Sequence, residues 1–197
     1  MALYAVFAVG IGNLGRQRMP RCPMTEWVKR LNRTLGNGTP PLQVVGFFGH
    51  TGNFLVSCSL TEPHAVRALF IGQLETDWIV RRIEDVKSAV TESATYPKPE
   101  ARLGIRWTQG LAFSEDPNME CKRLQWTPRA ILWEVCRGIS GVWKADRFVE
   151  RGILDSNRRS GGWGKISEDI GTQLGGRWTA RSLRTVQGLL RKANALT

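Results

Sequence analysis

The stretch Gly175-Gly-Arg-Trp-Thr-Ala-Arg-Ser-Leu-Arg-Thr-Val-Gln-Gly-Leu-Leu-Arg-Lys-Ala193 carries the strongest periodic pattern in the chain. At about 100° per residue, its apolar side chains fall on one side of a helix and its basic side chains fall on the other. Thr179 stands where an N-cap is expected, because a hydroxyl oxygen can accept a hydrogen bond from a backbone N–H of the first turn. The pattern predicts a helix over 179–193 with one side toward a core and one basic side.

A shorter helix is predicted over 165–174, and the glycines at 175 and 176 separate the pair. The apolar side of the later helix holds Leu183, Val186, Leu189, Leu190 and Ala193, and its basic side holds Arg181, Arg184, Arg191 and Lys192. Such a pair is compatible with a helix-turn-helix, in which the second helix enters a DNA major groove. The simpler interpretation is an amphipathic helix that closes a lobe.

The composition is that of a globular protein, with 197 residues of which 42% are hydrophobic and 23% are charged. The formal net charge of +11 attracts polyanions through screened Coulomb forces whatever the fold. From Lys98 onward the sequence holds 18 Lys and Arg residues against 10 Asp and Glu, and the preceding residues hold 10 against 7. We therefore expect a nucleic-acid partner that meets the C-terminal half, with a merely solvated basic surface as the alternative.

Four cysteines stand far apart, at Cys22, Cys58, Cys121 and Cys136, and none forms a Cys-x-x-Cys pair. We expect free thiols in a reducing cytosol and no metal site. Residues 1–15 are apolar but lack a preceding basic segment, so a strand is predicted there and not a signal peptide. No apolar run approaches the roughly 20 residues that span a bilayer. The expectation is a cytoplasmic protein without membrane contact or bound cofactor.

Short β-rich runs alternate with helical patterns in the first half of the sequence. The expected order is strand, helix, strand, strand, helix, strand, followed by a short helix. These elements are assigned to Leu3–Val9, Met24–Leu35, Leu42–Phe48, Phe54–Ser57, Pro63–Leu74, Trp78–Val80 and Ile83–Val90. The order is the split β-α-β arrangement of a ferredoxin-like sheet. The helix residues expected to face that sheet are Trp27, Leu31, Val66 and Phe70.

A link between lobes is expected at Ser93–Glu100, which contains two prolines. A second β-rich region starts at Leu103–Trp107, and its clearest strand is Ala130–Cys136. We therefore expect an α+β protein with two ferredoxin-like lobes, at 1–96 and 97–197. The second lobe is expected to be irregular, basic and closed by the C-terminal helix pair.

The loop Gly10-Ile-Gly-Asn-Leu-Gly15 matches the glycine spacing of dinucleotide-binding loops. Such a loop needs a helix that starts on it and faces the pyrophosphate, yet Pro20 and Pro23 interrupt the residues that follow. The next β-like run also ends in Gly49-His50 and not in an acidic residue. We expect a surface loop close to a ligand or a partner, and no nucleotide cradle.

Three segments together resemble the bacterial domain-of-unknown-function 1697 family. The family's opening loop is matched by Val9-Gly-Ile-Gly-Asn-Leu-Gly15, and its Ser-Gly-Asn hairpin is similar to Thr51-Gly-Asn53. Its Thr-x-Arg-Asn-Trp-x-Thr-Val pattern is similar to Thr179-Ala-Arg-Ser-Leu-Arg-Thr-Val186. Departures include Val9, where the family usually has an arginine. The resemblance implies two α+β lobes with a plaited sheet, and no chemistry that can be carried over.

Basic residues of the C-terminal part form the predicted nucleic-acid site, together with one tryptophan. An indole ring beside cations can stack on a base while the cations hold phosphates, although packing in the interior is the alternative for this ring. The candidate site consists of Arg158, Arg159, Lys165, Arg177, Trp178, Arg181, Arg184, Arg191 and Lys192. Binding to single or double strands with weak sequence specificity is the leading hypothesis.

An enzyme of unknown reaction is the second hypothesis, with a polar site formed by Asn13, His50, Thr51 and Asn53. Acidic pairs such as Glu84-Asp85 suggest a metal-dependent nuclease. Adjacent acids usually point in different directions on a helix, however, so no metal site is predicted. A third hypothesis is an interaction module whose basic face meets an acidic protein.

Overall fold

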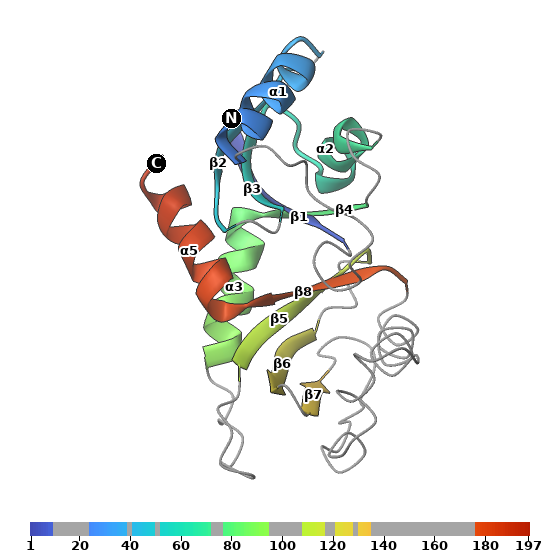
Figure 1. Cartoon of the computed structure of the whole chain (residues 1–197), viewed down its shortest axis with the longest axis vertical. Helices are drawn as coiled ribbons and strands as arrows, with labels where there is room; N and C mark the ends of the chain where they lie inside the picture. The colour runs from blue at the N-terminus through green and yellow to red at the C-terminus, as the bar shows by residue number, and fades with distance from the viewer. Residues whose placement is uncertain are drawn as a thin grey trace. The chain divides into compact units, whose positions relative to one another are not determined.

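The computed structural model describes residues 1–9, 24–38, 41–49, 52–71, 77–94, 108–116, 121–127, 130–134 and 176–197 (Figure 1). Within these ranges the protein is mixed α+β, with two four-stranded sheets and four helices. Every strand pairing in both sheets is antiparallel. The α+β class predicted from the sequence is confirmed.

The first sheet has the strand order β2-β3-β1-β4, so β2 and β4 are its edges. Its strands and the helices between them are β1 (Ala2–Ala8), α1 (Met24–Gly36), β2 (Leu42–Phe47), β3 (Asn53–Cys58), α2 (Pro63–Phe70) and β4 (Trp78–Arg82). The predicted order of strand, helix, strand, strand, helix, strand is confirmed. The predicted second helix is shorter at its end, because the structure ends it at Phe70.

Alternate residues of these strands are apolar and pack with α1 and α2 in one hydrophobic core. Trp78 lies at its centre and is fully buried, with ring centroids 6.1 Å from Phe54 and 5.2 Å from Phe70. Leu31, Val66 and Phe70 are buried as predicted, and the side chain of Trp27 lies outside the described residues. The buried Cys58 is a free thiol in β3, also as predicted.

The second sheet joins strands that are far apart in the sequence, in the order β7-β6-β5-β8. Its strands are β5 (Thr108–Ser114), β6 (Cys121–Thr127), β7 (Ala130–Glu134) and β8 (Trp178–Ser182). α3 (Ile83–Ala94) follows β4, and α5 (Leu183–Asn194) follows β8. Of the predicted elements here, the strand from Ala130 is confirmed, and the helix over 165–174 lies outside the described residues.

The helix predicted over 179–193 is wrong at its start, because residues 178–182 form β8. β8 pairs with β5 and places Arg181 opposite Leu111 and Thr179 opposite Phe113. Successive side chains alternate along a strand, and Thr179 and Arg181 are both buried. Thr179 is therefore not a helix N-cap. Pairing with a distant strand decides this segment, since strand formation depends more on tertiary neighbours than on local propensity.

The same junction between a strand and a helix occurs twice, 100 residues apart. Trp, Arg, an aliphatic residue and Val recur at positions 78, 81, 83 and 86 and at positions 178, 181, 183 and 186. Arg81 and Arg181 occupy the same register position, against β1 and β5 respectively. A backbone hydrogen bond closes each copy, from the Val9 N–H to the Asp77 carbonyl at 2.8 Å and from the Glu115 N–H to the Arg177 carbonyl at 2.7 Å.

The chain divides into two compact units, one of which is discontinuous in sequence. Residues Met1–Ser88 and Thr185–Thr197 form unit 1, and residues Ala89–Arg184 form unit 2. Most of α5 thus belongs with the first sheet and not with β8, which it follows. The lobe boundary between residues 96 and 97 stays a prediction.

Candidate nucleic-acid interface

The structure describes six of the nine predicted binding residues. Arg177, Arg184, Arg191 and Lys192 are exposed, Trp178 is half-buried and Arg181 is buried. Arg158, Arg159 and Lys165 lie outside the described residues. Four of the predicted cations are therefore in contact with solvent.

Arg181 is the predicted binding residue whose side chain lies in the interior, with 8% of its surface exposed. Its guanidinium donates hydrogen bonds to the hydroxyl of Thr179 and, at 2.7 Å, to the carbonyl of Ala180. Burial disfavours the charged form and lowers the pKa of Arg181 to about 10. The expectation that Arg181 shares an exposed basic side with Arg184 is wrong, because the alternation of β8 turns it inward.

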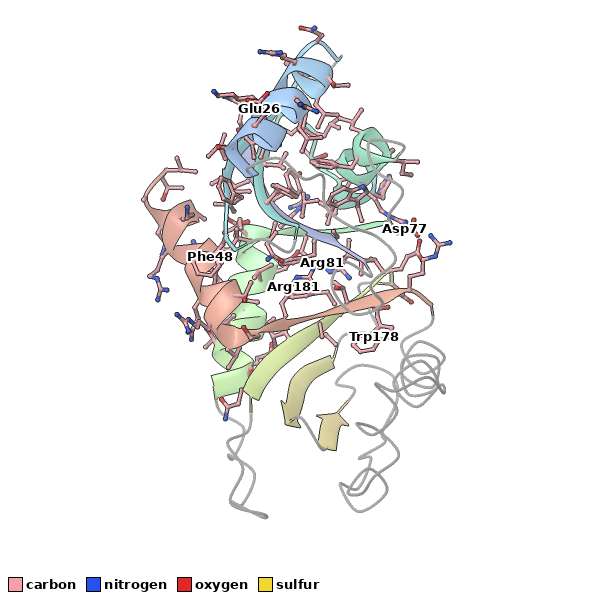
Figure 2. All side chains as sticks on the ribbon, in the orientation of Figure 1. Glu26, Phe48, Asp77, Arg81, Trp178 and Arg181 are labelled. Carbon is pink, nitrogen blue, oxygen red and sulfur yellow. The ribbon has the colours of Figure 1, made fainter. Side chains whose placement is uncertain are left out.

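An apolar side and one close contact hold α5 on unit 1. The side chains predicted to face inward are buried at Val186, Leu189, Leu190 and Ala193, and half-buried at Leu183. A Cβ atom at Gly188 would lie 2.3 Å from Cε2 of Phe48, so the absence of a side chain lets the helix backbone approach that ring. Figure 2 shows Phe48 beside α5.

The last turn of α5 presents Arg191 and Lys192 to solvent. Cations at this end complement the partial negative charge of the helix C-terminus. The Nζ atom of Lys192 lies 5.3 Å from the centre of the Phe47 ring, which is a cation–π contact. The basic side of α5 therefore meets the end of β2.

A second group of exposed cations, absent from the predicted site, lies on α1. Its members are Lys29, Arg30 and Arg33. Nε of Arg30 lies 3.7 Å from a carboxylate oxygen of Glu26, one helical turn earlier. Lys29 and Arg33 make no ion pair with any residue that the structure describes. They are available to an anion from outside.

Asn32 lies between these cations and fastens α1 to β2. Its side-chain amide donates to the Val44 carbonyl at 3.0 Å, and its side-chain oxygen accepts from the Val44 N–H at 2.7 Å. Both polar backbone groups of Val44 thus face away from β3, and Asn32 takes the place of a further strand at this edge. α1 and α5 therefore contact the same edge strand.

The positions of acidic residues are the signal that could have revealed the α1 cations. Glu26 is the only acidic residue before Glu62, and none follows Asp169. Residues 1–61 carry six Lys and Arg residues against one acid, residues 170–197 carry five against none, and the residues between carry 17 against 16. The positive charge thus comes from both ends of the sequence, which a comparison of two halves does not reveal.

Asn53 is the described member of the predicted polar site and is 1% exposed. Its side-chain amide donates to the carbonyl of Phe48 at 3.0 Å, and its own carbonyl accepts from the Phe48 N–H at 3.1 Å. These bonds close the hairpin between β2 and β3, where Gly49 and Gly52 have positive φ angles of 71° and 65°. Asn53 therefore has a structural task in the hairpin. Asn13, His50 and Thr51 lie outside the described residues.

Unit 1 also contains a pocket of about 430 Å³, whose lining includes Ser57, Thr61, Arg82 and Glu84. The guanidinium of Arg82 donates to the Thr61 carbonyl and lies 3.6 Å from Glu62, so its charge is already engaged.

In the described ranges, no three His, Cys, Asp or Glu side chains are grouped so as to hold a metal ion. In this part of the chain, no helix has the length and hydropathy needed to cross a bilayer.

Comparison of the chain with protein-family models, with curated proteins and with solved structures found no match. The candidate interface therefore rests on its own geometry and charge.

Proposed function

We propose that the protein binds nucleic acid through the exposed cations of α5, Arg184, Arg191 and Lys192. The observation that carries this proposal is the way α5 packs. Its apolar side is buried, so its basic side faces solvent, and the helix contains no acidic residue. Cations held in this way bind phosphates favourably because they release the counterions condensed on the polyanion.

We also propose a specific fold for unit 1 and kinship with a known family. A ferredoxin-like fold for unit 1 is supported by the strand order β2-β3-β1-β4 and by the alternation of strands and helices. Kinship with the domain-of-unknown-function 1697 family is supported by the three sequence segments that resemble it. Neither assignment implies a catalytic activity. A cytoplasmic location is proposed together with the nucleic-acid partner.

Fluorescence anisotropy of labelled single- and double-stranded oligonucleotides at about 50 mM and about 200 mM salt tests the proposed binding. Each phosphate contact contributes about 0.7 to 0.9 to the slope of log K against log salt, so three contacts give a slope of about 2 to 3 in magnitude. The double variant Arg184→Gln/Arg191→Gln should lower that magnitude by about 1.4 to 1.8. Arg181 is unsuitable for this test because its side chain is buried.

Lys87→Gln is the control, because Lys87 is exposed on α3, a helix that carries three acidic residues, Glu84, Asp85 and Glu92, against this one cation. It removes a cation from a neighbourhood that is already partly neutralised, so the salt slope should stay at the wild-type value. Thermal melts show whether each variant is folded. No wild-type binding at the lower salt, or an unchanged slope in the double variant, would contradict the proposal.

A further inference from the structure

The exposed cations of α1 and of α5 border the same edge strand. α1 reaches β2 through the Asn32 bonds to Val44, and α5 reaches it through Lys192 over the Phe47 ring and Gly188 against Phe48. All of these residues belong to unit 1. Figure 1 shows α1 and α5 on either side of β2. Residues 41–49, which include β2, carry no charge.

Acidic residues lie close to Arg67, Arg82 and Arg30 in the described part of unit 1. Arg67 lies 3.8 Å from Asp77, Arg82 lies 3.6 Å from Glu62, and Arg30 lies 3.7 Å from Glu26. β4, which follows Asp77, is the opposite edge of the sheet from β2, and Figure 2 shows Asp77 and Phe48 on opposite sides. Lys29, Arg33, Arg191 and Lys192 make no ion pair with any residue that the structure describes.

We infer that Lys29 and Arg33 of α1 act with Arg191 and Lys192 of α5 as one phosphate-binding surface along β2, the α1–α5 strip. This inference rests on the proposed function, and it adds residues from the first third of the chain to a site expected only at the C-terminal end. The partner is the sugar–phosphate backbone of a nucleic acid. The two acid-poor ends of the sequence supply the two helices of the strip.

Binding at the strip is directed to the backbone and is independent of base sequence. Base stacking needs an aromatic ring with a free face. Of the rings that the structure describes along β2, the Phe47 ring lies under Lys192, and the half-buried Phe48 ring packs against Gly188. The polar groups that the strip offers are cations on long, flexible side chains, which neutralise phosphates without distinguishing the bases.

The contacts of α1 and α5 disfavour two other partners. A helix that binds a membrane surface inserts its apolar side into the lipid, but the apolar sides of α1 and α5 are buried, for example at Leu35 and Leu189. A peptide that extends a sheet needs the free N–H and C=O groups of the edge strand. Asn32 already occupies those groups at Val44.

The test uses the full chain and a matched pair of variants, Lys29→Gln and Lys87→Gln. Each removes one exposed helical lysine that belongs to unit 1, and only Lys29 belongs to the strip. Anisotropy titrations use labelled single strands and duplexes of two unrelated sequences. Lys29→Gln should lower the magnitude of the salt slope by about 0.7 to 0.9, Lys29→Gln/Arg33→Gln should lower it by about 1.4 to 1.8, and Lys87→Gln should leave it unchanged.

The outcomes separate this inference from the proposed function. No binding by the wild type removes both. Wild-type binding that weakens in Arg184→Gln/Arg191→Gln but not in Lys29→Gln/Arg33→Gln supports the function and overturns the strip. Equal losses in Lys29→Gln and Lys87→Gln show a diffuse attraction and also overturn it. Tighter binding to poly-glutamate or to anionic lipid vesicles than to oligonucleotides overturns the choice of partner, and a strong preference for one base sequence overturns backbone-directed binding.

Discussion

Arg81 in β4 and Arg181 in β8 are arginines at equivalent positions of the two sheets. Each is less than one tenth exposed, and each donates from Nη1 to the carbonyl of the residue before it, at 2.8 Å and 2.7 Å. A buried guanidinium is costly unless its N–H groups are hydrogen-bonded. These bonds hold the side chain at the junction between strand and helix, and they separate Arg181 from the exposed cations that follow it on α5.

Gly188 is expected to be required by the ring of Phe48. Gly188→Ala should lower the free energy of unfolding by about 1 to 2 kcal/mol, because the new methyl group overpacks the contact. In a Phe48→Ala background the same change should raise it by about 0.5 to 1 kcal/mol, because alanine favours the helix. Urea unfolding of the four proteins in this cycle measures both effects. Equal stabilisation in the two backgrounds would mean that Phe48 does not pack on Gly188.

β2 shows how one element can protect an exposed edge of a sheet. An unpaired edge strand is a template for association with other chains. α1 covers this edge through Leu31 and Leu35, which share a core with Val44, and through the two hydrogen bonds of Asn32. The same helix turns Lys29 and Arg33 to solvent. Protection of the edge and display of positive charge are therefore two consequences of one amphipathic helix.

Asn32→Ala is expected to destabilise the protein and to open the edge of β2. Loss of both bonds leaves the N–H and carbonyl of Val44 without their partner, at a cost of about 1 to 3 kcal/mol. Urea unfolding measures this cost, and sedimentation velocity at several concentrations should show more dimer than in the wild type. Asn37→Ala is the matched control, since Asn37 is exposed just after α1. A monomeric Asn32→Ala protein of wild-type stability would refute this account of the edge.

At the scale of the whole molecule, unit 1 gathers both ends of the sequence. The segments 1–61 and 170–197 carry 11 of the 28 Lys and Arg residues but only one of the 17 acidic residues. Unit 1 contains the whole of the first segment and residues 185–197 of the second. Two acid-poor segments that are distant in sequence therefore become parts of one positively charged body, held together by the apolar side of α5.

A chain that ends at Ser182 is expected to lose the stability of unit 1. Burial of Val186, Leu189 and Leu190 contributes roughly 5 to 9 kcal/mol, at about 1.5 to 3 kcal/mol for each side chain. That loss is comparable with the total stability of a typical domain, about 5 to 15 kcal/mol. Near-ultraviolet circular dichroism and binding of a hydrophobic dye measure the loss, and a synthetic peptide of residues 183–197 should reverse it. A truncated chain with an unchanged melt would show that α5 is dispensable.

Local pattern was enough to predict much of unit 1 and the inner side of α5. The apolar spacing of α1, the hairpin of β2 and β3 and the burial of Val186 and Leu189 all follow from residues within one or two turns of each other. A period of 3.6 or of 2 in apolar residues is a local property, since it reflects how one element meets one core. The sequence therefore determined that α5 has a buried side and a basic side.

Tertiary structure alone decided where the buried side and the basic side of α5 lie, and which other residues lie on the same part of the molecule. Arg181 lies inside because residues 178–182 pair with β5, and no local period records a partner so far away in sequence. α1, which carries Lys29 and Arg33, and α5 contact the same strand, β2, because α5 packs on unit 1. The sequence alone tells how many cations a chain has. Long-range packing decides which of them border the same strand.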